Sequence, residues 1–254
     1  MYPQQRQATI LEVINRDGGA RITDLGRSLG VSGVTARRDI EVLAGRGLVA
    51  RVRGGAVALT RSLDGPGRHP RRRQREKLAI ARAAAGLVRP GEAIGILAGT
   101  TTLLLAAELL DVPGLTVLTN SIPVADVFHG AGRPDRTVVL TGGTRSATDA
   151  LVGPVARHTA AGINLDVLFL GTYGMTARAG CTTPDLAEAQ THGMLVRAAR
   201  RVVVLADHSK WGVTGVATVA PLAGVDVLVS DDGLSRSARA ALREHVGELM
   251  LAAG

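Results

Sequence analysis

The chain has 254 residues, of which 46% are hydrophobic, and its formal net charge is +8 at pH 7. This length suits one large domain or two smaller ones, and no apolar run reaches the roughly 18 to 20 residues that a membrane helix needs. The first residues are polar and charged where a signal peptide would be apolar, so we expect a cytoplasmic location and no membrane partner. A single cysteine, Cys181, excludes an intramolecular disulfide framework.

The charge is distributed unevenly along the chain. Residues 1–75 hold 15 arginines and 6 acidic residues, a balance of +9, whereas residues 76–254 hold 15 basic and 16 acidic residues, a balance of −1. Arginines displace counterions from phosphates, so a small basic module joined to a near-neutral larger one is typical of a nucleic-acid-binding protein. We therefore expect double-stranded DNA as a partner of the N-terminal module.

The N-terminal module is predicted to begin with three helices. The first covers about residues 4–15 and ends at a glycine pair, and the next two meet at a turn at Gly30. Ser32 can cap the third helix with its hydroxyl. This helix carries an apolar stripe at helical spacing, which we expect to be buried, and two adjacent arginines off the stripe, which we expect to face outward. The stripe is Ala36, Ile40 and Leu43, and the arginines are Arg37 and Arg38.

A glycine pair between apolar β-formers, Gly54 and Gly55, predicts a hairpin after the third helix. Three helices and a hairpin make a winged helix-turn-helix, in which the third helix enters the major groove and the wing lies against the phosphate backbone. Base reading then falls to residues 32–38, with Arg38 contacting guanine through O6 and N7. The arginines expected at the DNA are Arg37 and Arg38 on the helix and Arg51 and Arg53 on the hairpin.

The third helix has an alternative interpretation. Short helix pairs are common and charge runs usually face water, so this helix could instead be a solvated surface helix that does not contact DNA. If the helix does bind DNA, Asp39 and Glu41 are expected to orient the arginines or to repel the phosphate backbone of non-target DNA. They are not expected to contact DNA directly.

Residues 60–75 contain glycine, proline and several arginines without periodicity, which predicts a basic linker between residues 1–59 and residues 76–254. The linker is either a further DNA contact or a solvated hinge. From residue 76 onward helix and strand patterns alternate, and short runs of β-branched residues and leucine end in small or polar residues. We therefore expect an α/β fold in which a winged helix-turn-helix precedes an effector-sensing domain with a mainly parallel sheet, covered by helices on both faces.

In such sheets a ligand binds outside the carboxyl ends of the strands. One strand end opens directly into a helix at Gly99, where backbone N–H groups and threonine hydroxyls favour an anion, but the pattern is neither a Walker loop nor a dinucleotide fingerprint. Lys210, one of only two lysines, either neutralises a phosphate at the same rim or is an ordinary loop lysine. The residues expected at this rim are Gly99, Thr100, Thr101, Thr102, Asn120, Ser121, Gly142, Gly143, residues 171–174 and residues 207–210.

Catalytic motifs are scarce. The six histidines are scattered without metal-ligand spacing, and no nucleophile-elbow motif indicates a Ser, His and Asp set. Asp207 and His208 beside Lys210 could do acid–base chemistry, but nothing in the sequence requires it. We expect a binding protein that is not an enzyme and that uses no metal or cofactor.

At "VSGVTARRDIEVLAGRGLVARVRGGAV" the chain resembles the DeoR family of bacterial transcription regulators, and "AGTTTLLLA", "TNSIPVA", "TTPDLAEA" and "VVVLADHSKWG" follow in the family's order. The resemblance implies a winged N-terminal domain and a sensor similar in fold to ribose-5-phosphate isomerase. Family members usually repress operons of sugar or nucleoside catabolism and are released by a phosphorylated sugar. Matched position by position, Ser32, Thr35, Arg37 and Arg38 fall in the recognition helix, and residues 99–102, Asn120, Ser121 and Lys210 fall in the effector pocket.

The chain departs from the family pattern at two acidic pocket positions. Leu97 and Ala98 stand where many members have Asp-Ser, and Thr172 and Tyr173 stand where they have Ala-Asp. Tyr173 is expected to stack on the ligand or to fill part of the pocket. Carboxylates there would hydrogen-bond sugar hydroxyls or serve as a base, so their loss argues against an enzyme.

The leading hypothesis is a homo-oligomeric transcriptional repressor, a dimer or a tetramer, that binds paired half-sites on operator DNA and senses a phosphorylated sugar. The effector would favour a protomer arrangement that mismatches the operator, which requires different effector affinities in the two states. The alternatives are a sugar-phosphate isomerase-like enzyme with a DNA-binding appendage, and a constitutive repressor with a degenerate sensor.

Overall fold

The computed structural model describes residues 3–17, 19–45, 49–52, 54–58 and 73–253. The chain forms two compact units, Met1–Arg72 and Arg73–Gly254. Each unit is described by itself. Among the described residues, no helix is both long enough and apolar enough to cross a membrane.

The first unit contains the three expected helices and the hairpin. Its helices are α1 (Pro3–Asp17), α2 (Ile22–Leu29) and α3 (Gly33–Gly45), and its strands are β1 (Gly19–Arg21), β2 (Val49–Val52) and β3 (Gly55–Ala58). The strands form an antiparallel sheet in the order β1-β3-β2, and Val52 pairs with Gly55 across the hairpin. Strand β1 was not expected, because it begins within the glycine pair that ends the first helix and its three residues are held in place by pairing with β3.

The turn between α2 and α3 depends on two glycines. Gly30 ends α2 in the left-handed conformation, with φ 65°, which a residue with a side chain rarely adopts. A Cβ on Gly26 would lie 3.0 Å from the carbonyl oxygen of Val31, so the small residue permits the close approach of the turn. The expected cap is present, since the Thr35 N–H donates to Ser32 Oγ over 3.1 Å.

The core of the first unit is built from apolar side chains of all three helices and the sheet. The predicted stripe of α3 is confirmed, because all three side chains are at most 2% exposed. They pack with residues of α1, α2 and the strands. The buried members are Ile10, Ile14, Leu25, Ala36, Ile40, Leu43, Val49 and Ala56.

The second unit is built on a seven-stranded sheet in the order β15-β14-β12-β9-β4-β5-β6, and every strand pair in it is parallel. The expected mainly parallel α/β fold is therefore confirmed. Its strands are β4 (Ala93–Ile96), β5 (Thr116–Thr119), β6 (Thr137–Leu140), β9 (Val167–Gly171), β12 (Val202–Leu205), β14 (Val227–Asp231) and β15 (Glu248–Ala252). The edge strand β15 was not among the expected ones.

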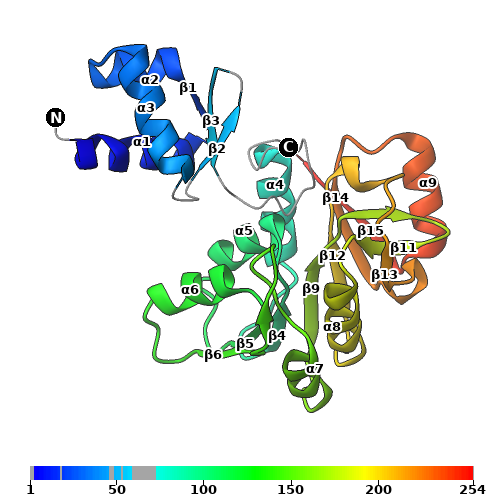
Figure 1. Ribbon diagram of the computed structural model, residues 1–254. Coiled ribbons are helices and arrows are strands. Elements are labelled where there is room, and N and C mark those ends of the chain that lie inside the picture. Colours follow the sequence, from blue (N-terminus) through cyan, green and yellow to red (C-terminus); the bar gives the residue numbers. More distant parts are fainter. Residues whose placement is uncertain (1–2, 18, 46–48, 53, 59–72, 254) are drawn as a thin grey trace. The chain divides into compact units, whose positions relative to one another are not determined.

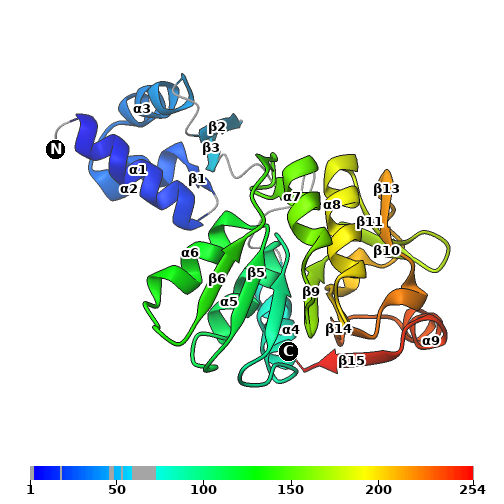
Figure 2. The same cartoon turned by 90° about the horizontal axis from the view of Figure 1, so that it is seen from below.

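Helices cover both faces of the large sheet (Figures 1 and 2). In β9, Val167 and Phe169 point to the face covered by α4, α5 and α6, and Leu168 and Leu170 point to the face covered by α7, α8 and α9. The helices are α4 (Gln74–Ala85), α5 (Thr100–Glu108), α6 (Ile122–Gly130), α7 (Pro154–Ala161), α8 (Leu186–Arg197) and α9 (Arg236–His245). Because α4 begins at Gln74, the last two residues of the segment 60–75, which we expected to be linker, are helical; residues 59–72 lie outside the described residues.

Two smaller sheets complete the second unit. Strands β10, β11 and β13 form an antiparallel sheet, and β7 and β8 form a hairpin between β6 and α7. Two short 3-10 turns, η1 and η2, follow β12 and β13. The bounds are β7 (Thr144–Arg145), β8 (Leu151–Val152), β10 (Gly174–Thr176), β11 (Gly180–Thr183), β13 (Ala217–Ala220), η1 (His208–Lys210) and η2 (Leu222–Gly224).

Candidate functional site

The outer face of α3 presents polar and basic groups at its N-terminal half. Arg37 and Arg38 are exposed, and Val34 beside them is 79% exposed. The hydroxyls of Ser32 and Thr35 lie 2.9 Å apart, so these two residues use part of their hydrogen-bonding capacity on each other. A short helix with outward arginines at its N-terminal end has the shape and charge that a major groove accepts.

The expectation for Asp39 is wrong. This carboxylate is 4% exposed and faces the interior of the unit, where it accepts from Arg6 Nε over 2.5 Å and from Gln7 Nε2 over 3.1 Å. The hydrogen bond to Asp39 raises the pKa of Arg6. Asp39 therefore ties α1 to α3 and does not orient the arginines on the outer face. Of the expected wing residues, Arg51 lies in β2 and Arg53 lies outside the described residues.

The expected ligand-binding residues of the second unit follow the carboxyl ends of five parallel strands, β4, β5, β6, β9 and β12. Gly99 is the N-cap of α5 and residues 100–102 form its first turn, so three helix N–H groups face the rim without an intrahelical partner. Thr102 is fully buried and its hydroxyl donates to the Gly99 carbonyl over 2.9 Å. The backbone of this turn, and not the Thr102 hydroxyl, is thus the group offered to an anion.

A lysine that the sequence reasoning missed lies at this turn. Lys77 of α4 is 3% exposed, and its Nζ donates to Thr100 Oγ1 over 2.9 Å. The sequence does contain a pattern that could have revealed this lysine. Lys77 lies at helical spacing with Ile80 and Ala84, so it is a cation on the apolar, buried stripe of α4. The charge of Lys77 adds to the positive end of the α5 helix dipole, and both favour an anion at this turn.

Asn120, which follows β5, is fully buried and its amide is completely engaged. Its Oδ1 accepts from the Ala98 N–H over 2.9 Å, and its Nδ2 donates to the Leu151 carbonyl over 3.3 Å and lies 3.1 Å from His192 Nε2. Ser121 caps α6 by accepting from the Val124 N–H. Both residues hold the shape of the rim, and this geometry does not support the direct ligand contact expected of Asn120.

Gly142 and Gly143 follow β6 at the same edge of the sheet. Gly143 has φ 117°, and a Cβ there would lie 2.5 Å from the Val152 carbonyl oxygen, so only glycine fits between β6 and the hairpin. Tyr173 follows β9, is half-buried, and donates its backbone N–H to the Thr182 carbonyl. Leu97, at one of the positions where a carboxylate was expected, is 1% exposed and packs in the apolar cluster beneath α7, α8 and α9.

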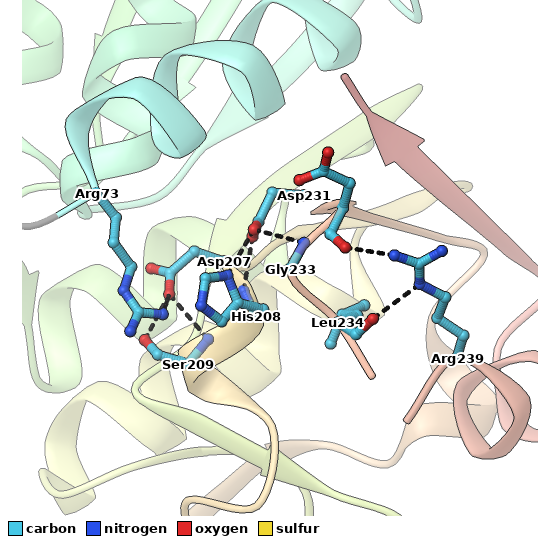
Figure 3. A network of polar contacts seen from close by, with 9 residues as sticks. Arg73, Asp207, His208, Ser209, Asp231, Gly233, Leu234 and Arg239 are labelled. Carbon is cyan, nitrogen blue, oxygen red and sulfur yellow. Dashed lines mark hydrogen bonds and ion pairs between the residues drawn. The ribbon is translucent and has the colours of Figure 1, made fainter. Parts of the chain in front are cut away.

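A polar network joins the ends of β12 and β14 to the start of α4 (Figure 3). Asp207 is 2% exposed, caps the turn η1, and accepts from Arg73 Nη1 over 3.2 Å. His208 Nδ1 lies 2.5 Å from Asp231 Oδ2, and Asp231 also accepts from the His208 and Gly233 backbones. Burial alone would raise the pKa of Asp231, but these hydrogen bonds hold it below its ordinary value. Lys210 is 7% exposed and ends the same turn.

Two further polar residues on the buried stripe of α8 were missed. Glu188 accepts from Thr148 and from Thr183 Oγ1, and His192 contacts Asn120 from the same helix face. Burial lowers the pKa of His192, although the nearby Glu188 opposes this shift. Because Asn120 Nδ2 is a donor, His192 Nε2 is its acceptor, and the ring is neutral. Their signal was the i, i+4 spacing of two polar residues on a stripe that continues to Leu195.

The described part of the chain contains the single cysteine and side chains of the types that bind metal ions. Within it, no group of three or more His, Cys, Asp or Glu side chains could hold a metal ion. Cys181 is fully buried, and burial raises the pKa of its thiol to about 12, so the thiolate is scarce at neutral pH.

The first unit has the parts of a winged helix-turn-helix, and the second has two buried lysines and a helix N-terminus at the carboxyl ends of a parallel sheet. A winged helix-turn-helix joined to a parallel α/β domain is typical of DNA-binding regulators. The DeoR-like helix-turn-helix domain matches residues 6–62, and the DeoR C terminal sensor domain matches residues 72–232. The chain belongs to the DeoR family of transcriptional regulators.

Curated relatives cover at least nine-tenths of the chain. The HTH-type transcriptional regulator GlpR of Haloferax volcanii is 35% identical over 246 residues, which cover 94% of each chain. The transcriptional repressor AccR of Agrobacterium fabrum is 31% identical, covering 91% of this chain and 90% of the relative. The glycerol-3-phosphate regulon repressor of Escherichia coli is 28% identical and covers 99% of this chain and its own full length. Among solved structures, ribose 5-phosphate isomerase A of Methanocaldococcus jannaschii matches with a TM-score of 0.39 and 19% identity, over 53% of each chain.

Proposed function

We propose that this protein is a transcriptional repressor of a sugar catabolic operon, controlled by a phosphorylated sugar that binds at the strand ends of the second unit. Residues 1–59 read operator DNA, the segment that ends at Arg72 connects the domains, and residues 73–254 sense the ligand. A homo-oligomer, a dimer or a tetramer, presents two recognition helices to paired half-sites.

The observation that carries the ligand proposal is the position of the two lysines. The chain has no others, both are at least nine-tenths buried, and both lie at the carboxyl-end rim of the sheet. Lys77 donates to the first turn of α5, and Lys210 ends the turn after β12. Two buried cations and a helix N-terminus attract a phosphate dianion, and the hydroxyl-rich strand ends suit the sugar.

Three features support the DNA proposal. The basic excess of the chain lies in residues 1–75, Arg37 and Arg38 are exposed on α3, and the relatives that match end to end are named as transcriptional regulators and repressors. The same relatives favour a regulator over an enzyme, as does the apolar packing of Leu97 at a position where a carboxylate would be needed for base catalysis.

The proposal is tested by fluorescence anisotropy on labelled DNA from upstream of the protein's own gene and on a scrambled duplex, both near physiological salt. We expect the upstream DNA to bind at least about 10³-fold more tightly than the scrambled one. Glycerol 3-phosphate, fructose 1-phosphate and ribose 5-phosphate are then added, with the free sugars and inorganic phosphate as controls. One ester is expected to weaken operator binding at least tenfold while its free sugar does nothing. Equal binding to both duplexes would contradict the proposal, and turnover of ribose 5-phosphate would revive the isomerase alternative.

A further inference from the structure

The second unit starts with a residue in an unusual conformation. Arg73, the first residue after the unit that ends at Arg72, has φ 68° and ψ 36°, the left-handed region that is strained for a residue with a side chain. Its side chain reaches the end of β12, where Nη1 donates to Asp207 Oδ1 over 3.2 Å. The ion pair therefore accompanies a strained backbone at the point where the chain enters the second unit.

Two cations lie at the start of α4. Arg73 is its N-cap, and the Lys77 N–H donates to the Arg73 carbonyl over 2.9 Å, so the two residues are one turn apart along the chain. Lys77 reaches Thr100 at the start of α5, and Arg73 reaches Asp207 at the end of β12. The entry to the unit and the rim of the ligand site are thus built from the same helical turn.

The carboxylate that holds Arg73 is itself fixed. The Asp207 side chain is 3% exposed and also accepts from the backbone and hydroxyl of Ser209. The next residue, His208, is anchored to Asp231 at the end of β14, and Arg239 of α9 holds the segment after Asp231 by donating to the Leu234 carbonyl over 2.9 Å (Figure 3). Because its partner cannot follow, Arg73 can leave Asp207 only by moving its own side chain and the strained backbone that carries it.

We propose that the Arg73–Asp207 ion pair is the latch through which the ligand site controls the peptide that leads to residues 1–72. This inference rests on the proposed function. A bound phosphate dianion carries more charge than a carboxylate and would lie beside the turn that Asp207 caps and Lys210 ends, so it competes with Asp207 for the guanidinium. When Arg73 turns to the phosphate, the left-handed backbone at residue 73 relaxes and the preceding peptide leaves the unit in another direction. The latched and unlatched states differ in ligand affinity, as any such coupling requires.

The latch predicts opposite effects of its two partners on ligand affinity. Trp211 is the only tryptophan and directly follows Lys210, so its fluorescence reports binding of the phosphate ester identified in the panel above. Arg73→Gln removes a phosphate ligand and is expected to weaken binding at least threefold. Asp207→Asn keeps an acceptor for Ser209 but removes the competing charge, so it is expected to tighten binding at least threefold.

Both variants are expected to lose control of DNA binding in the same way. At ester concentrations tenfold above each variant's own Kd, the operator Kd should change less than about twofold, against at least tenfold in the unmodified protein. Without ester, each variant should already show the operator Kd of the liganded unmodified protein. Arg73→Lys, which keeps the charge, should retain a response, and Arg133→Gln, which breaks the separate Arg133–Asp135 pair, should behave like the unmodified protein in both assays.

The outcomes separate the latch from the function on which it rests. If the unmodified protein shows neither operator preference nor a fluorescence response, the proposed function fails, and the latch fails with it. If the unmodified protein responds and Arg73→Gln keeps the full change in operator Kd, the latch alone is overturned. Weaker ester binding by Asp207→Asn would overturn it too, because a purely structural or ligand-contacting carboxylate would act in that direction.

Discussion

Asn120 Nδ2 lies 3.1 Å from Nε2 of His192, and the contact joins two residues that are 72 positions apart. Asn120 also holds the backbone at Ala98, directly before the N-cap of α5. The neutral imidazole of His192 on α8 therefore holds Asn120 in place, and Asn120 in turn holds the backbone at the rim of the proposed phosphate site. Protonation of the ring would set a donor against the Asn120 amide and remove this support.

The first prediction is that His192 makes stability depend on pH. Since burial lowers its pKa, the unfolded chain binds a proton below the ordinary value of 6.5 that the folded chain excludes. The free energy of unfolding should therefore fall as the pH drops below 6.5, by at most about 1.4 kcal/mol per pH unit for this one group. Urea unfolding followed by Trp211 fluorescence between pH 7.5 and 5 measures the slope, and His192→Gln should make it shallower. Equal slopes would show that His192 is not the titrating group.

The second prediction separates base reading from phosphate contact. Arg38→Ala should cost about 1 to 3 kcal/mol on the operator and relax specificity at one base position, because it removes a bidentate guanine contact. Arg51→Ala should weaken operator and scrambled DNA alike and reduce the slope of log K against log salt by about 1. Anisotropy titrations at several salt concentrations measure both effects.

Arg236→Ala, an exposed arginine at the start of α9, is the matched control and should change neither quantity. Equal losses on both duplexes for Arg38→Ala would remove its role as a base contact.

The third prediction concerns Lys77. Lys77→Met keeps the apolar stem but removes the cation at the first turn of α5, and a hydrogen bond to a charged group is worth about 1.5 to 3 kcal/mol. Ester affinity, measured by Trp211 fluorescence, should fall roughly 10- to 100-fold while affinity for DNA in the absence of ester changes little. Arg200→Met removes a cation whose side chain is 82% exposed and should leave the ester Kd unchanged. An unchanged Kd for Lys77→Met would place the phosphate elsewhere.

The fourth prediction concerns Asp231. Burial opposes its ionisation, but hydrogen bonds from His208 and Gly233 keep its pKa below the ordinary value of 3.8. The stability contributed by the carboxylate is therefore present above pH 3.8 and is lost as the pH falls through the lower, folded-state pKa. Asp231→Asn should be less stable at pH 6 and should lose less on acidification to pH 3, as measured by urea unfolding. A steeper loss in the variant would contradict the assignment.

Sequence periodicity predicted the elements whose burial follows from their own residues. The stripe Ala36, Ile40 and Leu43 fixed the inner face of α3, and runs of Val, Ile and Leu located six of the seven parallel strands. The order of the strands in the sheet could not be predicted from periodicity, because it depends on which way each connecting helix crosses the sheet. Strand β1 was missed for a related reason, since three residues form a strand here only by pairing with β3.

The parts of the site that were missed are polar residues on buried helix faces. Lys77, Glu188 and His192 each lie on the buried, otherwise apolar stripe of a helix. Periodicity therefore predicts that these side chains are buried but cannot predict which residues they contact. Their partners Thr100, Thr148 and Asn120 come from distant segments. Asp39 was misassigned in the same way, because nothing near it in sequence shows that α1 packs across α3.

The pairing of β1 with β3 closes the first unit's sheet within the first 58 residues. During synthesis this part of the chain leaves the ribosome well before Lys210, and domains generally fold in that order. Nascent or truncated chains that end before α4 would therefore already hold the recognition helix but would lack the entire ligand site. On the proposed function, such fragments would compete for the operator without responding to the ligand, so premature termination within this gene would yield a dominant inhibitor of induction. A missense change in the core of the first unit would instead abolish repression.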